Sequence, residues 1–211
     1  MNKKTSINTA VSVLLVTFVF CSSSFAQAHK AGGSRKLLQV KRMRTLGPRY
    51  LVETPQYNTD ASRGKADPQK WQQITVQYST APLWIDELSI QFYALAVTRD
   101  EKTGKNVLSL YKLNVKYVDI AQGRDHKATV FLRPTALKRY GDVFAVAAVF
   151  TVDGKVVAET SESTNSRLPK DWWKNQQVMG RPDMVVRNGY LLNRSKTPWA
   201  FINYDDYEVI K

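Results

Sequence analysis

Hydrophobic and polar residues alternate with a period of two through most of the chain between residues 72 and 158. Because successive side chains of a β-strand point to opposite faces, this period predicts strands with one buried face. The run 143–152, VFAVAAVFTV, is almost entirely apolar, so we expect it to form a central strand. The alternating segments are 72–78, 88–97, 107–118 and 128–132.

Residues with turn-forming chemistry separate these segments, and two dipeptides predict tight hairpins. Asp153-Gly154 and Asn188-Gly189 each lie between two apolar runs. A two-residue hairpin turn needs positive φ angles, which aspartate, asparagine and glycine adopt most readily. No segment keeps a period of 3.6 over ten or more residues, and we expect 134–140 to be a short helix or an irregular corner.

The strand pattern predicts an all-β fold. Seven or eight strands over about 120 residues are typical of an immunoglobulin-like antiparallel sandwich of two sheets with a C-terminal extension. An eight-stranded closed barrel is the alternative, because the pattern does not show whether the sheet edges pair with each other. A length of 211 residues predicts one domain, or one domain with an appendage.

The N-terminus has the pattern of an export signal. Lys3 and Lys4 precede the apolar run 10–21, and Ala26-Gln27-Ala28 supplies a cleavage site before His29. A membrane-spanning helix needs about 20 apolar residues, so this run is too short to remain as one. We therefore expect an exported protein that is periplasmic, outer-membrane associated or secreted, and that does not span the membrane after cleavage.

Composition divides the chain into four expected parts. They are a signal peptide (1–28), a basic N-terminal arm with the first strand (29–65), the β-sandwich core (66–163), and an aromatic C-terminal extension that packs on the sandwich (164–211).

The net charge of +13 arises mainly in the basic arm. Positive residues along an edge strand discourage aggregation between sheets, and this is the interpretation we favour. The same charges could also contact an anionic surface, acidic glycans or an acidic partner. Nucleic acid is not an expected partner, because the arm lacks interleaved aromatic residues and the chain has an export signal. The residues of the arm are Arg35, Lys36, Lys41, Arg42 and Arg44.

Candidate catalytic chemistry is scarce. Cys21 is the only cysteine and lies within the signal segment, and His126 is the only histidine beyond the cleavage site region. We expect His126 to be a surface residue, because no nucleophile motif or phosphate-binding loop accompanies it. The acidic residues at 205, 206 and 208 lack the spacing of a calcium-binding EF-hand loop. The sequence therefore predicts no enzyme activity, no cofactor and no metal site.

Four tryptophans are candidates for surface contacts. Exposed tryptophan rings can stack on sugars, and the candidates for this role, with ordinary packing as the alternative, are Trp84, Trp172, Trp173 and Trp199. Trp172 and Trp173 are adjacent, so on a strand one of the two would point outward. The residues predicted to contact a partner are Trp172, Trp173, Tyr190 and Trp199.

The C-terminal segment resembles a known family. The runs Asp171-Trp172-Trp173, 189–199 (GYLLNRSKTPW) and Asp206-Tyr207-Glu208 are similar to an exported immunoglobulin-like family of verrucomicrobial bacteria. One member is encoded in a type IV pilus gene cluster of a mucus-dwelling gut bacterium. The resemblance implies a non-enzymatic protein whose partners are envelope or pilus-assembly proteins, or a host surface. It supplies no catalytic residues.

Two other functions remain open from the residues alone. The first is a carbohydrate-binding module for mucin or cell-wall glycans, which would use an exposed tryptophan. The second is an enzyme such as a glycosidase, for which the sequence offers no supporting cluster of polar residues.

Overall fold

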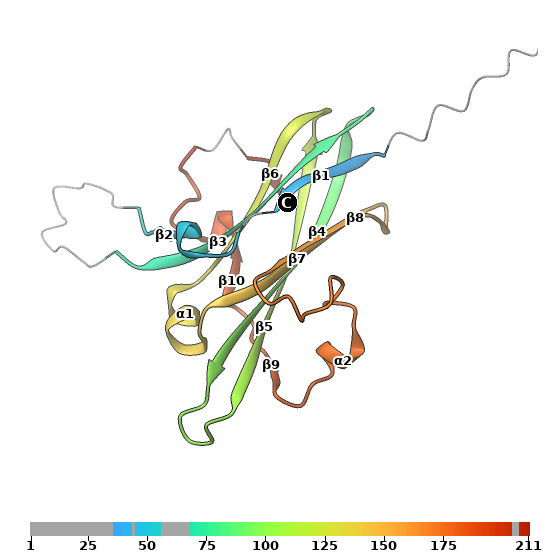
Figure 1. Ribbon diagram of the computed structural model, residues 1–211. Helices are drawn as coiled ribbons and strands as arrows, with labels where there is room; N and C mark the ends of the chain where they lie inside the picture. The colour runs from blue at the N-terminus through green and yellow to red at the C-terminus, as the bar shows by residue number, and fades with distance from the viewer. Residues whose placement is uncertain (1–35, 44, 56–67, 204–206) are drawn as a thin grey trace, which may run out of the picture. The chain divides into compact units, whose positions relative to one another are not determined.

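A computed structural model describes residues 36–43, 45–55, 68–203 and 207–211 of the protein (Figure 1). The expected signal peptide, residues 1–28, lies outside the described residues. So do Arg35 and Arg44 of the basic arm and the acidic pair at 205–206.

The first of two sheets contains β1 (Leu38–Met43), β2 (Leu51–Glu53), β3 (Lys70–Thr80), β6 (Gly123–Leu132) and β10 (Leu191–Asn193). Its strand order is β1-β3-β6-β10, and β2 also pairs with β3. All of these pairs are antiparallel.

The second sheet contains β4 (Ile85–Arg99), β5 (Asn106–Ile120), β7 (Val143–Val152), β8 (Lys155–Ser163), β9 (Met184–Val186) and β11 (Val209–Ile210). Its order is β11-β5-β4-β7-β8, and β9 also pairs with β5. The β5–β9 pair is parallel, whereas the other described pairs of this sheet are antiparallel. Two separate sheets confirm the predicted all-β sandwich, and the closed barrel is not formed.

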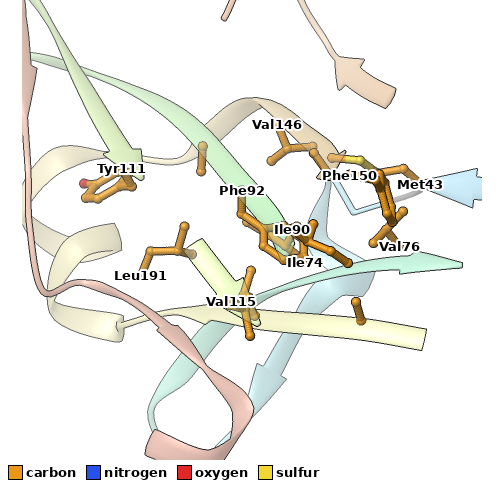
Figure 2. Packing of buried hydrophobic residues seen from close by; sticks show 14 of the residues in the cluster. Met43, Ile74, Val76, Ile90, Phe92, Tyr111, Val115, Val146, Phe150 and Leu191 are labelled. Atoms are coloured by element: carbon orange, nitrogen blue, oxygen red, sulfur yellow. The ribbon is translucent and has the colours of Figure 1, made fainter. Parts of the chain in front are cut away.

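The main core lies between the two sheets. Ile74 and Val76 of β3 face Ile90 and Phe92 of β4, with Phe150 of β7 beside them (Figure 2). Burying an aliphatic or aromatic side chain of this size stabilises the fold by about 1.5–3 kcal/mol relative to leaving it in water. The alternation along β3 and β4 thus arises because each strand needs one apolar face toward the other sheet.

A third layer covers the opposite face of the second sheet. Residues 164–183 run over this face and include the short helix α2 (Gln176–Met179). Trp172 and Trp173 of this segment pack in a second apolar cluster. The sheet residues of that cluster are Leu95, Leu110, Ala145 and Ala147. Because β7 is buried on both faces, its sequence is apolar at nearly every position.

The two predicted hairpins have different outcomes. Asp153 and Gly154 have φ angles of 49° and 73° and join β7 to β8, which confirms the first hairpin. The prediction at Asn188-Gly189 is wrong. The chain on either side of this pair belongs to different sheets, because β9 pairs with β5 and β10 pairs with β6. Gly189, with φ 79°, turns the chain from one sheet to the other instead.

Short helices complete the described structure. Residues 134–140 form α1 (Pro134–Tyr140), which confirms the predicted corner. Two single-turn 3₁₀ helices, η1 (Pro48–Tyr50) and η2 (Arg194–Lys196), follow β1 and β10. Among the described helices, none has the length and apolar character that crossing a membrane requires.

Gly141 ends α1 at a place where only glycine fits. Its φ is +81°, and a Cβ atom at this position would lie 2.1 Å from the carbonyl oxygen of Val97. We expect Gly141→Ala to lower the free energy of unfolding by about 3 kcal/mol, from the unfavourable φ and the steric clash together. Gly154→Ala is the matched control, because Gly154 has φ +73° and open space around it.

Urea denaturation of both variants measures the difference. The control should lose about 1 kcal/mol, from backbone strain alone. Equal losses in the two variants would contradict the steric role of Val97.

Candidate functional site

The C-terminal segment, residues 191–211, contributes an edge strand to each sheet. It begins in β10, which pairs with β6, and ends in β11, which pairs with β5. Between them, Trp199 stacks on Phe131 of β6 with ring centroids 4.5 Å apart. Trp71 of β3 packs against the same indole edge to face, at 5.5 Å. These contacts hold the segment across the outer face of the first sheet.

Ion pairs hold the last strand in place. The Nζ atoms of Lys116 and Lys211 lie 2.9 and 2.8 Å from the two carboxylate oxygens of Glu87. The backbone amide of Lys211 also donates to the carbonyl of Lys116 at 2.9 Å. The hydrogen bond from Lys211, which has the larger effect, and the one from Lys116 lower the pKa of the Glu87 carboxyl from 4.5 to about 2.

A second polar contact joins this strand to the core. Nδ1 of His126 lies 2.5 Å from Oε1 of Glu208. The Thr80 hydroxyl donates to the Ala121 carbonyl at 2.7 Å and accepts from the Gly123 amide at 3.1 Å. Its remaining lone pair faces Nε2 of His126 at 3.2 Å. Both ring nitrogens thus lie against oxygen atoms, Nδ1 against the Glu208 carboxylate and Nε2 against the Thr80 hydroxyl.

The expectation that His126 lies on the surface is therefore wrong. Its side chain is largely buried, with its ring stacked on Tyr78 at 5.3 Å. The partner, Glu208, is 82 residues away in sequence, so no local pattern indicates the pair. One carboxylate, and no serine hydroxyl, is hydrogen-bonded to His126 among the described residues.

A cavity of about 220 Å³ opens beside this pair, between β6 and β11. Tyr117 of β5 lies in its wall, and burial, with the nearby Glu208 carboxylate, raises the pKa of the Tyr117 hydroxyl. Arg194 of η2 lies in the wall as well. The remaining lining residues are Lys127, Thr129, Ser195, Ala200, Tyr207, Glu208, Val209 and Ile210.

The sequence does not predict this cavity. In the sequence, Tyr117 is one more residue of an alternating strand, and Arg194 is one more basic residue of the C-terminal segment. Both residues line the cavity because the C-terminal segment pairs with one sheet at β10 and with the other at β11. No group of three or more potential metal ligands occurs among the described residues.

The predicted contact residues Trp172 and Trp173 are both buried, so the prediction that one points outward is wrong. They lie in consecutive turns, not on a strand, and the alternation argument does not apply there. Their rings pack edge to face, 6.1 Å apart, on the second sheet.

Tyr190 and Trp199, the other two predicted contacts, are half-buried. The Tyr190 ring packs edge to face on Tyr140 at 5.5 Å and on Tyr111 at 6.2 Å. Both residues therefore take part in packing the C-terminal segment against the sandwich, and their role in partner contact stays a prediction.

The basic arm residues that the structure describes lie on or beside an edge strand. Lys36, Lys41 and Arg42 are exposed, and β1 pairs with β3 at the end of its sheet. Lys41 forms an ion pair with Asp125 at 2.9 Å. This placement fits the interpretation that the charges protect a sheet edge.

The most exposed tryptophan is Trp84, in the loop between β3 and β4. Trp84 is 63% exposed and its neighbour Leu83 is 67% exposed. The loop is short and held at both ends, because Thr80 and Ile85 on either side are buried. Two adjacent large apolar side chains are therefore presented to solvent from a fixed base.

Trp172 and Trp84 provide a matched pair for measuring packing. We expect Trp172→Ala to lower the free energy of unfolding by about 3–5 kcal/mol, because a fully buried indole is lost from the second cluster. Trp84→Ala, at an exposed position, should change it by no more than about 0.5 kcal/mol. Urea denaturation checks both, and a small loss at Trp172 would contradict a structural role for residues 164–187.

The Glu87 cluster predicts a pH dependence. The pKa of the Glu87 carboxyl is lower in the folded state, because the charged form is bound by Lys211 and Lys116. These ion pairs therefore stabilise the fold fully above about pH 4.5, and their contribution is lost as the pH falls toward 2. An NMR titration of the Glu87 carboxyl should give a midpoint near 2. Lys211→Ala should move the midpoint upward, and Lys105→Ala, which removes an exposed lysine from the β4–β5 turn, should not. A midpoint that ignores Lys211 would contradict the docking of β11.

Comparisons with known proteins agree with this architecture. The chain is similar to a protein of known crystal structure from Akkermansia muciniphila, a verrucomicrobe, with a TM-score of 0.64 and 27% sequence identity. The similarity covers 82% of this chain and 94% of that chain. No curated protein matches the sequence. A protein-family model matches residues 47–211. Since this is well over half of the sequence, the chain belongs to that family.

Proposed function

We propose that the protein is exported and non-enzymatic, and that it acts by protein–protein contact in the cell envelope. The finer part of the proposal is a role in type IV pilus-associated assembly or in contact with a host surface. The likeness to a verrucomicrobial structure supports it, together with the resemblance of the C-terminal segment to an exported family of these bacteria.

The observation that carries the contact role is the exposed loop with Leu83 and Trp84. Tryptophan is enriched among the few residues that supply most of the binding energy in protein interfaces. A loop held at both ends loses little conformational freedom when a partner binds it. The loop therefore has the chemistry and the rigidity of a contact site.

Glycan binding is the second candidate, and the same indole favours it because an exposed tryptophan can stack on a sugar ring. Of the described tryptophans, however, Trp84 alone is mainly exposed. Trp71 and Trp199 are half-buried and pack on each other, and Trp172 and Trp173 are buried. A single ring provides a small platform for a sugar, so protein contact is the better supported function.

The test is site-specific photo-crosslinking in intact cells. Trp84→p-benzoylphenylalanine should give a defined crosslinked protein band from the envelope. The control is the same substitution at Val186 in β9, which is 50% exposed. β9 pairs near Leu110 of β5, whereas Trp84 lies near Ile120, so the two positions are about 30 Å apart.

Serine variants separate the outcomes. The double variant Leu83→Ser with Trp84→Ser should recover at least about tenfold less of the crosslinked partner in a pull-down, while Val186→Ser should recover the wild-type amount. Absence of a reproducible band at position 84, or the same band at position 186, contradicts the proposal. A shift in tryptophan fluorescence with mucin glycans that Trp84→Ser abolishes would favour glycan binding instead.

A further inference from the structure

An apolar groove of about 620 Å³ lies on the outer face of the second sheet, between the end of β4 and the covering segment, residues 164–183. Val97 of β4 lines it and is 37% exposed, and Leu108 and Phe144 beside it are half-buried. Leu168 and Val178 of the covering segment, also half-buried, line it as well. The third layer therefore leaves apolar surface of the sheet open to solvent at this end.

The size of the groove matches the exposed pair Leu83–Trp84 of the β3–β4 loop. These two side chains are 67% and 63% exposed. A dry protein cavity of about 150 Å³ holds one benzene ring. In proportion, the about 14 non-hydrogen atoms of the two side chains need about 350 Å³, so both fit within the groove.

The pair and the groove lie at opposite ends of β4 (Figure 1). Trp84 directly precedes the first residue of this strand, whereas Leu95 and Val97 near its end line the groove. At about 3.4 Å per residue, the two positions are about 40 Å apart along the strand. The pair therefore cannot enter the groove of its own chain, and only the groove of another molecule is within its reach.

The charges beside the two positions are complementary. Asp86 of β4 and Asp119 of β5 are exposed next to the apolar pair, at the end of the β4–β5 ladder that begins with Ile85 and Ile120. Exposed Arg167 lines the groove. An incoming pair thus brings negative charge toward a cation, which guides the encounter and fixes the orientation of the two molecules.

The other described charges of the groove balance each other. Arg181 and Asp183 both line it, and their side chains form an ion pair at 2.6 Å. The amides of Asn106 and Gln177, both exposed, supply hydrogen-bond donors and acceptors at the same place. The groove therefore combines apolar surface with polar groups that can bind the backbone of an entering loop.

We propose that the protein binds a second copy of itself head to tail, with Leu83 and Trp84 of one molecule seated in the groove of the next. The inference rests on the proposed contact function of this loop and names its partner. The two contact surfaces differ, so a molecule that has bound once keeps one free pair or one free groove. Such a contact adds further copies and produces an open chain or a closed ring.

The first measurement is sedimentation velocity of the purified exported protein over a range of concentrations. We expect species larger than a dimer that grow with concentration, because a contact between unlike surfaces does not stop at two copies. The range should extend to about 200 μM, since small interfaces are weak.

Single-surface variants assign the contact. The double variant Leu83→Ser with Trp84→Ser, and separately Val97→Arg, which places a long charged side chain in the groove, should each weaken association at least about tenfold. Arg167→Glu should weaken it about threefold, as expected for an exposed ion pair. Val186→Arg is the matched control for Val97→Arg, because Val186 is an exposed strand valine outside the groove, and it should associate as wild type.

Mixing the two strong variants tests the head-to-tail geometry. The serine variant keeps its groove and Val97→Arg keeps its apolar pair, so an equal mixture should form dimers and nothing larger, while each variant alone stays monomeric. A symmetric dimer through the loop would instead leave Val97→Arg associating as wild type. If Val97→Arg does not fold, Gln177→Arg, at an exposed position of the groove, takes its place.

Crosslinking in cells separates this inference from the contact function itself. The photo-crosslinker at position 84 should join this chain to residues 164–183 of another copy. A crosslink to a different protein leaves the contact function standing and overturns the head-to-tail inference. The inference is also overturned if the wild type stays monomeric over the whole range, or if the mixture of variants forms no dimer.

Discussion

The sheet that contains β4, β5 and β7 is buried on both of its faces, and this constraint determines how the rest of the described chain is arranged. Its inner face packs on the first sheet, and its outer face carries Leu95, Leu110, Ala145 and Ala147. Those four side chains would meet water in a two-layer sandwich. Residues 164–183, which include Trp172 and Trp173, cover them. The aromatic tail is thus part of the core that stabilises the fold, because large apolar areas must leave water.

Much of the fold follows from local sequence, and the exceptions share one physical origin. The alternation in β4 and β5 and the turn at Asp153-Gly154 are decided by neighbouring residues, so both could be predicted. Asn188-Gly189 has equally good turn chemistry, but the strands on either side find partners in different sheets. Turn propensity describes the bend and says nothing about which strand lies beside the chain afterwards.

The candidate site depends even more on distant contacts. His126 contacts Glu208, which is 82 residues away, and Arg194 and Tyr117 line the same cavity although they lie on different elements, η2 and β5. Each is an ordinary residue in its own surroundings. Trp172 and Trp173 illustrate the opposite case, in which a conspicuous pair of aromatic residues serves packing. A conspicuous aromatic pair is therefore a poor guide to exposure here, whereas the single tryptophan at position 84 is exposed.

The small number of bonds that hold β11 has a consequence for local opening. β11 joins β5 through two residue pairs and the ion pair of Lys211 with Glu87, whereas β4 and β5 are 15 residues long and pair along their length. Separating β11 from β5 therefore breaks far fewer bonds than separating β5 from β4. Local opening of the described chain is easier at β11, next to the contact between Glu208 and His126, than in the centre of the second sheet.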